Sequence, residues 1–285
     1  MDINKVFVAG AGLMGAGIAY VVAAKAQKIV FMYDISQEFI DKGMKSINKV
    51  CQKAMEKGLI KPEEHVQIME RIIPTLDINK AGEADLVIEA IPEKLNLKRE
   101  FFSQLDKICP TGTILASNTS SLPITSIASA TKRPDKVIGM HFFSPVHLMK
   151  LIELIKGLDT SAQTFETVKE FSILLGKEIS TSNDFPGFIT TRLGLVLLNE
   201  AMFALMEGVG TTEDIDKAMK LGFNHPMGPL ELADAIGLDV CLSVMNVLYE
   251  GYQDTKYRAC PLLKQLVSAG HLGKKTGRGF YNYNK

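Results

Sequence analysis

Short runs of apolar and β-branched residues alternate along the first part of the chain with longer segments whose apolar positions repeat at helical spacing. The runs lie at residues 5–9, 28–33, 85–91, 113–118 and 136–143, with a further apolar run at 149–155. Strands that alternate with helices are typical of a parallel sheet, because each crossover between parallel strands carries a helix. The pattern predicts an α/β fold with an N-terminal doubly wound sheet.

The segment between the second and third runs, residues 37–73, is too long for a simple crossover. Its helical pattern breaks at Gly58 and restarts near Pro62, as expected for a glycine after a helix end and a proline in a first turn. We therefore expect a helical hairpin that projects from the sheet.

The pattern changes after the turn Asp184-Phe185-Pro186-Gly187, because helical signals dominate from there to about residue 270. We expect two domains, a sheet domain at 1–184 and an all-helical C-terminal domain at 185–285. Residues 188–206 are apolar on almost every side, but Asn199 and Glu200 interrupt the roughly 18 to 20 apolar residues that a membrane span needs. We predict a buried helix and no membrane association. Because about 100 residues cannot easily enclose such a helix, we also expect a homodimer through this domain.

A glycine-rich turn follows the first apolar run, and its sequence is Gly10-Ala11-Gly12-Leu13-Met14-Gly15. Gly10 permits the tight turn, Gly12 lets a pyrophosphate approach the backbone, and Gly15 lets the next helix pack on the strand. The N–H groups at the start of that helix, including those of Leu13 and Met14, then face the phosphates. This motif predicts a Rossmann-like nucleotide site.

Asp34 ends the second apolar run, 19 residues after Gly15. A carboxylate at this point can accept hydrogen bonds from a ribose 2′-hydroxyl and would repel a 2′-phosphate. The sequence therefore favours NAD over NADP as the cofactor.

Two other strand ends carry polar residues, Ser120 after one run and His141 within the next. Ligands of doubly wound sheets lie beyond the carboxyl ends of the strands, so both side chains can face one crevice. A histidine flanked by apolar residues is often only a core residue. Glu153 favours a functional role for His141, because a carboxylate in an apolar run needs a polar partner. An imidazole held by a carboxylate at one nitrogen can take a proton at the other.

Four lysines, Lys45, Lys49, Lys53 and Lys57, follow one another at four-residue spacing on the first hairpin helix. Like charges at this spacing repel one another by a few tenths of a kcal/mol per pair. The stripe is either a solvated face or a surface that meets a polyanionic ligand, and the spacing leaves both interpretations open.

Composition narrows the range of partners. The 285 residues include 32 basic and 32 acidic side chains, so no overall field attracts nucleic acid or an anionic membrane. The first strand begins at Lys5, which leaves no room for an export signal, and the four cysteines form no CxxC pair. We expect a cytoplasmic protein with reduced thiols. His141 and His147 lack a third ligand at suitable spacing, so no metal site is expected.

Six motifs together resemble the 3-hydroxyacyl-CoA dehydrogenases, most closely the short bacterial 3-hydroxybutyryl-CoA dehydrogenases. They lie at residues 10–15, 116–121, 139–145, 186–188, 225–229 and 274–281. The resemblance implies an NAD-dependent oxidoreductase that interconverts 3-hydroxyacyl-CoA, such as 3-hydroxybutyryl-CoA, and 3-oxoacyl-CoA, such as acetoacetyl-CoA. It also implies a helical domain that serves as a wall of the substrate cleft.

The resemblance assigns roles to particular residues. It implies that His141 is the catalytic base, that Glu153 orients it, and that Ser120 donates a hydrogen bond to the substrate. Lys53 and Lys57 match positions that contact coenzyme A. Cofactor contacts are implied for Asp34 and for three residues that spacing alone does not indicate, Glu93, Lys98 and Lys275.

Two positions depart from the short enzymes. Ser144, at a cofactor position, and Thr191, at a substrate position, replace the usual asparagines. A hydroxyl group is shorter than an amide and offers one donor instead of two. Ser144 and Thr191 therefore cannot make every hydrogen bond that an asparagine makes at these positions.

Overall fold

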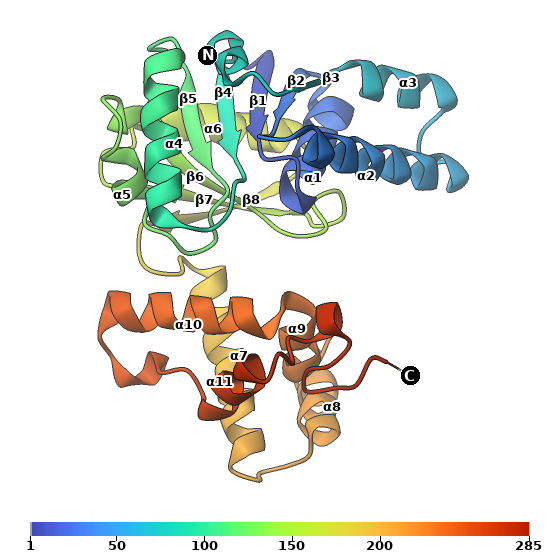
Figure 1. Cartoon of the computed structure of the whole chain (residues 1–285), viewed down its shortest axis with the longest axis vertical. Helices are drawn as coiled ribbons and strands as arrows, with labels where there is room; N and C mark the ends of the chain where they lie inside the picture. Colours follow the sequence, from blue (N-terminus) through green and yellow to red (C-terminus); the bar gives the residue numbers. More distant parts are fainter. Residues whose placement is uncertain (1, 285) are drawn as a thin grey trace. The chain divides into compact units, whose positions relative to one another are not determined.

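A computed structural model describes residues 2–284 and shows two compact units, which divide between Phe185 and Pro186. The first unit is an α/β sandwich built on one sheet, and the second is helical (Figure 1). The predicted fold class, a Rossmann-like sheet with a helical C-terminal region, is confirmed.

The sheet has the strand order β3-β2-β1-β4-β5-β6-β7-β8. Its strands are β1 (Lys5–Ala9), β2 (Ile29–Tyr33), β3 (Ile72–Thr75), β4 (Leu86–Glu89), β5 (Ile114–Ser117), β6 (Val137–Phe142), β7 (Leu151–Lys156) and β8 (Glu178–Asn183). The strands from β3 to β6 are parallel, whereas β7 pairs antiparallel with β6, and β8 pairs parallel with β7. The connection at residues 143–150 is too short for the dozen or more residues of a parallel crossover, so the chain reverses there.

Two strands, β3 and β8, were not predicted. The first contains only Ile72–Thr75 and includes Pro74, while the second, Glu178–Asn183, is mostly polar. Both lie at the edges of the sheet. An edge strand is held by main-chain hydrogen bonds to one neighbour and needs no apolar run, so the hydrophobic pattern does not reveal it.

Helices cover both faces of the sheet. On one face, α1 (Leu13–Val21), its π-helical continuation (Val22–Ala26) and α6 (Ala162–Leu174) share an apolar core with alternate strand residues such as Val6 and Val8. On the other face lies α4 (Leu95–Ile108), beside α5 (Ile124–Ala128). Tyr33 of the sheet stacks there on Phe101 of α4, with ring centroids 6.4 Å apart.

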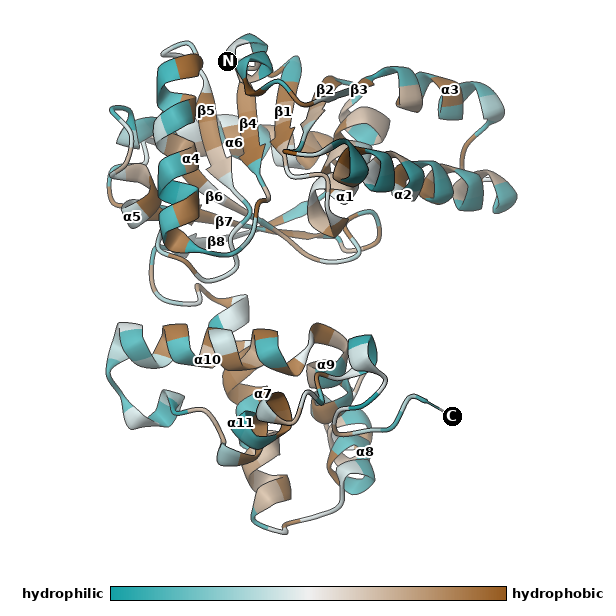
Figure 2. Ribbon diagram, viewed as in Figure 1, coloured by the Kyte–Doolittle hydropathy of each residue, from teal (hydrophilic) through white to brown (hydrophobic). Residues whose placement is uncertain are grey.

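The predicted hairpin is confirmed as α2 (Gln37–Glu56) and α3 (Pro62–Glu70), which extend past the sheet edge in Figure 1. The hydroxyl of Ser36 caps α2 by accepting from the amide of Phe39. Ile40, Gly43, Ile47 and Cys51 form its buried stripe. Most of the other residues of α2 are hydrophilic and teal in Figure 2, whereas the strands are mostly brown.

The helical unit contains α7 (Thr190–Met206), α8 (Thr212–Gly222), α9 (Pro229–Ile236), α10 (Leu238–Tyr252) and α11 (Pro261–Ser268). Short 3₁₀ helices occur in both units, at Ile78–Glu83, Pro134–Lys136, Thr255–Tyr257 and Lys274–Thr276. Leu198 and Met202 of α7 belong to the core of the unit, but Leu193 is 67% exposed and Leu197 is 38% exposed. One side of this helix packs against the unit and the other is exposed in the single chain, so its complete burial by a partner subunit stays a prediction.

Among residues 2–284, no single helix has both the length and the apolar composition to cross a membrane. The pair α9 and α10 reaches that length only together, across a bend of 97°.

Candidate active site

The glycine turn between β1 and α1 is shaped by contacts that exclude side chains. Gly10 has a φ of +103°, and a Cβ atom there would lie 2.6 Å from the carbonyl oxygen of Ala90. A Cβ atom on Gly15 would lie 1.8 Å from the carbonyl oxygen of Gly10. At Gly12, by contrast, a Cβ atom would meet nothing within 4 Å, so the backbone is open to a ligand on that side. These features fit the pyrophosphate of a dinucleotide.

Asp34 lies beside this turn at the end of β2. Its Oδ2 atom accepts a hydrogen bond from the amide of Ala11, and its Oδ1 atom accepts one from the amide of Ile35, both at 2.7 Å. The carboxylate is thus held at the mouth of the glycine turn, as the recognition of a ribose hydroxyl requires. Leu13, which begins α1 next to it, is 73% exposed and leaves the turn uncovered.

His141 and Glu153 are direct partners across the antiparallel ladder of β6 and β7. The Nδ1 atom of His141 lies 3.3 Å from Oε2 of Glu153. The glutamate is fully buried and the histidine is 7% exposed. The reversal of the chain after β6 therefore places a carboxylate next to the imidazole. The pair lies at the end of the sheet where the carboxyl ends of the parallel strands meet.

Ser120 follows β5 and is fixed by Glu93, which follows β4. The Oε1 atom of Glu93 accepts from the amide of Ser120 at 3.0 Å and from the hydroxyl of Thr119 at 2.5 Å. The side-chain oxygen of Asn118 accepts from the amide of Phe142 at 2.9 Å. The loop that carries Ser120 is thereby tied to the end of the strand that carries His141.

Lys98 is one of the largest fully buried side chains of the sheet unit, with 1% of its surface exposed. Its Nζ atom lies 2.6 Å from Oε1 of Glu89 and 3.1 Å from Oε2 of Glu93. Glu89 is a functional candidate that our sequence reasoning missed. It lies in the apolar run 85–91, so the argument that singled out Glu153 also applied to it.

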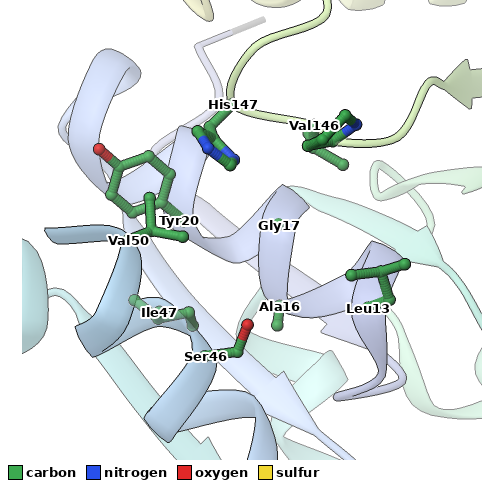
Figure 3. A pocket seen from close by; sticks show the side chains of 10 residues that line it. Leu13, Ala16, Gly17, Tyr20, Ser46, Ile47, Val50, Val146 and His147 are labelled. Atoms are coloured by element: carbon green, nitrogen blue, oxygen red, sulfur yellow. The ribbon is translucent and has the colours of Figure 1, made fainter. Parts of the chain in front are cut away.

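An apolar pocket of about 60 Å³ lies between α1, α2 and the loop after β6, and includes Gly17, Tyr20, Val50 and Val146 (Figure 3). His147 lines it, with its ring edge-on to Tyr20 at 6.1 Å between centroids. Burial lowers the pKa of His147, and the positive charges of Lys177, Lys53 and Lys57 lower it further. The lysines at the end of α2 therefore act electrostatically on the loop after β6.

The loop after β6 is tied to the body of the sheet by Lys177, which is 8% exposed. Its ammonium group donates to the carbonyl oxygens of Val146 and Met149, at 2.5 and 2.6 Å. Ser144 lies in this loop, directly after the strand of His141, and is exposed.

Two of the predicted site residues, Thr191 and Lys275, belong to the helical unit. Thr191 lies in the first turn of α7 and is 8% exposed. The Nζ atom of Lys275 lies 2.5 and 2.7 Å from the two carboxylate oxygens of Asp239, at the start of α10. Burial opposes ionisation of Asp239, but the hydrogen bond from Lys275 is part of what holds its pKa below the usual value.

No group of three or more His, Cys, Asp or Glu side chains that could hold a metal ion occurs within residues 2–284. The Nε2 atom of His65 lies 2.8 Å from Oδ1 of Asn48, across the hairpin.

Comparisons with known proteins match almost the whole chain. Residues 5–184 match the family described as 3-hydroxyacyl-CoA dehydrogenase, NAD binding domain, and residues 187–283 match the C-terminal domain of that description. The 3-hydroxybutyryl-CoA dehydrogenase of Bradyrhizobium diazoefficiens is 50% identical over 281 residues, which cover 99% of this chain and 96% of that protein. The 3-hydroxybutyryl-CoA dehydrogenase of Clostridioides difficile is 47% identical, with coverage of 99% and 100%.

A solved structure shows the same architecture. The crystal structure of (S)-3-hydroxybutyryl-CoA dehydrogenase from Ralstonia eutropha superimposes with a TM-score of 0.96 at 43% identity, and the match covers the full length of both chains.

Proposed function

The chain belongs to the 3-hydroxyacyl-CoA dehydrogenase family and is an NAD-dependent dehydrogenase, and from this we propose that it interconverts 3-hydroxybutyryl-CoA and acetoacetyl-CoA. The names of relatives at about half identity over their full length support this substrate. The observation that carries the proposal is the buried His141–Glu153 pair. It lies at the carboxyl ends of the parallel strands, where the glycine turn also lies.

When bound, NAD supplies the acceptor for the hydride that leaves C3 of the substrate. His141 takes the proton of the 3-hydroxyl group as that hydride departs, and returns it in the reverse direction. With Glu153 at Nδ1, the imidazole carries its proton on that nitrogen, and Nε2 is the nitrogen that accepts the proton of the substrate. The negative charge of Glu153 then stabilises the imidazolium ion. A base positioned in this way contributes about 10²- to 10⁴-fold to the rate.

Ser120 holds the reacting oxygen of the substrate in line with His141. Its own position comes from Glu93, which binds its amide. Ser144 takes part in cofactor binding, and Thr191 in substrate binding, each through its hydroxyl group. Lys275 is a further cofactor contact, and Asp239 holds its ammonium group.

Lys53 and Lys57 bind phosphate groups of coenzyme A. Lys53 is exposed in the last turn of α2 and Lys57 is exposed at its C-cap, and both help to lower the pKa of His147, which lines the apolar pocket of Figure 3. A polyanionic substrate relieves the mutual repulsion of the lysine stripe. A dehydrogenase for a free hydroxy acid would have no use for this stripe.

The direct test is oxidation of NADH by the purified protein with acetoacetyl-CoA, with free acetoacetate, and without substrate. We expect rapid oxidation with the thioester alone. Equal rates with acetoacetate would point to a free-acid dehydrogenase. Binding of NADH without turnover of either substrate would contradict the proposed activity.

We also propose that two chains pair through the helical unit, in the cytoplasm. The apolar side chains that α7 leaves exposed, Leu193, Leu197 and Met206, support the pairing. The four cysteines are free thiols, which suits a reducing compartment. Sedimentation of a stable monomer at micromolar concentration would contradict the dimer. The role of the helical unit as a wall of the substrate cleft stays a prediction.

A further inference from the structure

Glu89 is a fully buried carboxylate that accepts hydrogen bonds from three different segments. Its Oε1 atom accepts from Lys98 at 2.6 Å and from the amide of Ile91 at 2.8 Å. Its Oε2 atom accepts from the hydroxyl of Ser117 at 2.6 Å. Burial raises the pKa of Glu89, while Lys98, Ser117 and the amide of Ile91 oppose that rise.

Each of these bonds leads to a segment that carries predicted site residues. The bond to the amide of Ile91 fixes the turn that contains Ala90, whose carbonyl oxygen packs against Gly10. The hydroxyl of Ser117, the cross-strand partner of Glu89, accepts in turn from the amide of Thr119. One side chain thus orients both the glycine turn and the loop after β5.

The third bond leads to Ser120 through Lys98. The ammonium group of Lys98 bridges Glu89 and Glu93 and also donates to the carbonyl oxygen of Ile91 at 3.3 Å. Glu93, held in this way, accepts from the amide of Ser120. Since Lys98 is 1% exposed and has three oxygen partners, its contacts are already satisfied within the protein.

A buried ion pair adds little net stability, because the cost of removing two charges from water offsets much of their attraction. Two well-packed uncharged side chains of similar volume are often at least as stable. What the Glu89–Lys98 pair supplies here, and an apolar pair would not, is a fixed direction for Glu93, Ser117 and Ile91.

We propose that Glu89 is a positioning residue for the cofactor and substrate crevice. Lys98 takes part through its contacts with Glu89, Glu93 and the carbonyl oxygen of Ile91. The inference rests on the proposed function and deepens it, since it names the group that holds Ser120 and the glycine turn in position relative to each other.

The test uses three variants of the full chain, Glu89→Gln, Lys98→Met and the double variant E89Q/K98M. For each we would measure the melting temperature, the Kd of NADH from its fluorescence, and kcat and KM with acetoacetyl-CoA. Each single variant removes one partner of the buried Glu89–Lys98 ion pair and will lower the melting temperature. The double variant contains neither charge, and its melting temperature should return towards that of the original protein.

If the Glu89–Lys98 pair positions the site residues, kcat will stay low in E89Q/K98M although its melting temperature recovers. We expect kcat to fall on the order of 10²-fold in E89Q/K98M, with weaker NADH binding, because small displacements at a reacting centre cost about this much. The effects of the two substitutions should not add, because both break the same link.

Asp106→Asn is the matched control. Asp106 pairs with Arg133 at 2.7 Å, with both side chains about 10% exposed, at the opposite end of α4. This variant should lose stability and keep both NADH affinity and kcat.

Two outcomes would overturn the proposal. Full return of NADH affinity and kcat in E89Q/K98M would make the pair purely structural. Normal NADH affinity in Glu89→Gln with lost affinity in Lys98→Met would make Lys98 a direct cofactor contact. If the unmodified protein failed to reduce acetoacetyl-CoA, the proposed substrate would be wrong, but the NADH affinities and melting temperatures would still decide the role of Glu89.

Discussion

The Nδ1 atom of His141 lies 3.3 Å from the carboxylate of Glu153, its direct partner across the only antiparallel pairing among the eight strands of the sheet. Antiparallel partners stand opposite each other and project to the same face, so the reversal after β6 is what brings the acid to the base.

Replacement of His141 by Gln should lower kcat by about 10²- to 10⁴-fold, because the general base is lost while the shape of the crevice is kept. The Kd of NADH should change little. Stopped-flow or steady-state oxidation of NADH with acetoacetyl-CoA measures kcat, and NADH fluorescence measures the Kd. His65→Gln, in the hairpin, is the control and should retain full activity. A kcat of His141→Gln within a few-fold of the original would exclude this base.

Replacement of Asp34 by Asn should relax the preference for NAD over NADP. Asn keeps an oxygen that can accept from the amide of Ala11, but it removes the charge that repels a 2′-phosphate. We expect the ratio of kcat/KM for NADPH to that for NADH to rise about tenfold or more.

Asp85→Asn is the matched control for this substitution. The carboxylate of Asp85 also accepts from two backbone amides, those of Asn4 and Lys5, but at the opposite end of β1. Its coenzyme preference should not change. An unchanged coenzyme preference in Asp34→Asn would mean that Asp34 does not recognise the 2′-position of the ribose.

The double variant Lys53→Ala with Lys57→Ala should raise KM for acetoacetyl-CoA about tenfold, since two exposed charge pairs contribute up to about 1 kcal/mol each. KM for the acetoacetyl thioester of N-acetylcysteamine, which lacks the phosphates, should stay the same. Lys107→Ala with Lys132→Ala removes the same charge from another exposed surface and serves as the control. Equal changes for both substrates would identify the stripe as a solvated face.

The pKa of His147 is lowered by burial and by nearby lysines, so the ring stays neutral to a more acidic pH than an ordinary histidine. Loss of Lys53 and Lys57 removes positive charge and should raise this pKa. Coenzyme A should raise it as well in the original protein, because bound phosphates offset the same lysines. An NMR titration of the His147 ring measures both shifts. An unchanged pKa of His147 on addition of coenzyme A would mean that its phosphates do not bind at Lys53 and Lys57.

Burial raises the pKa of Cys51 and Cys109 to about 11 and that of Cys241 to about 12, and it also raises the pKa of Cys260. Below these values the thiolate, which is the reactive form, is scarce. The folded protein should therefore resist a thiol reagent such as dithionitrobenzoate at mildly alkaline pH, and all four thiols should react after denaturation. Rapid reaction of any one of them in the folded state would reveal local opening.

Much of the fold follows from local patterns. The apolar runs predicted β1, β2, β4, β5, β6 and β7, and the glycine and proline positions predicted the hairpin. These features depend on residues near one another in sequence, where periodicity and turn chemistry act directly. The edge strands β3 and β8 carry no such pattern, because their main-chain bonds to one neighbour suffice.

Local patterns in the chain were enough to predict the glycine turn with its acidic partner Asp34, the strand that carries His141, and a carboxylate at Glu153 in an apolar run. The antiparallel pairing of β7 with β6, which sets His141 opposite Glu153, became visible in the folded chain alone. The same holds for the burial of Lys98 between Glu89 and Glu93. Strand direction and the pairing of buried charges depend on which distant segments become neighbours, and no local pattern of residues specifies that.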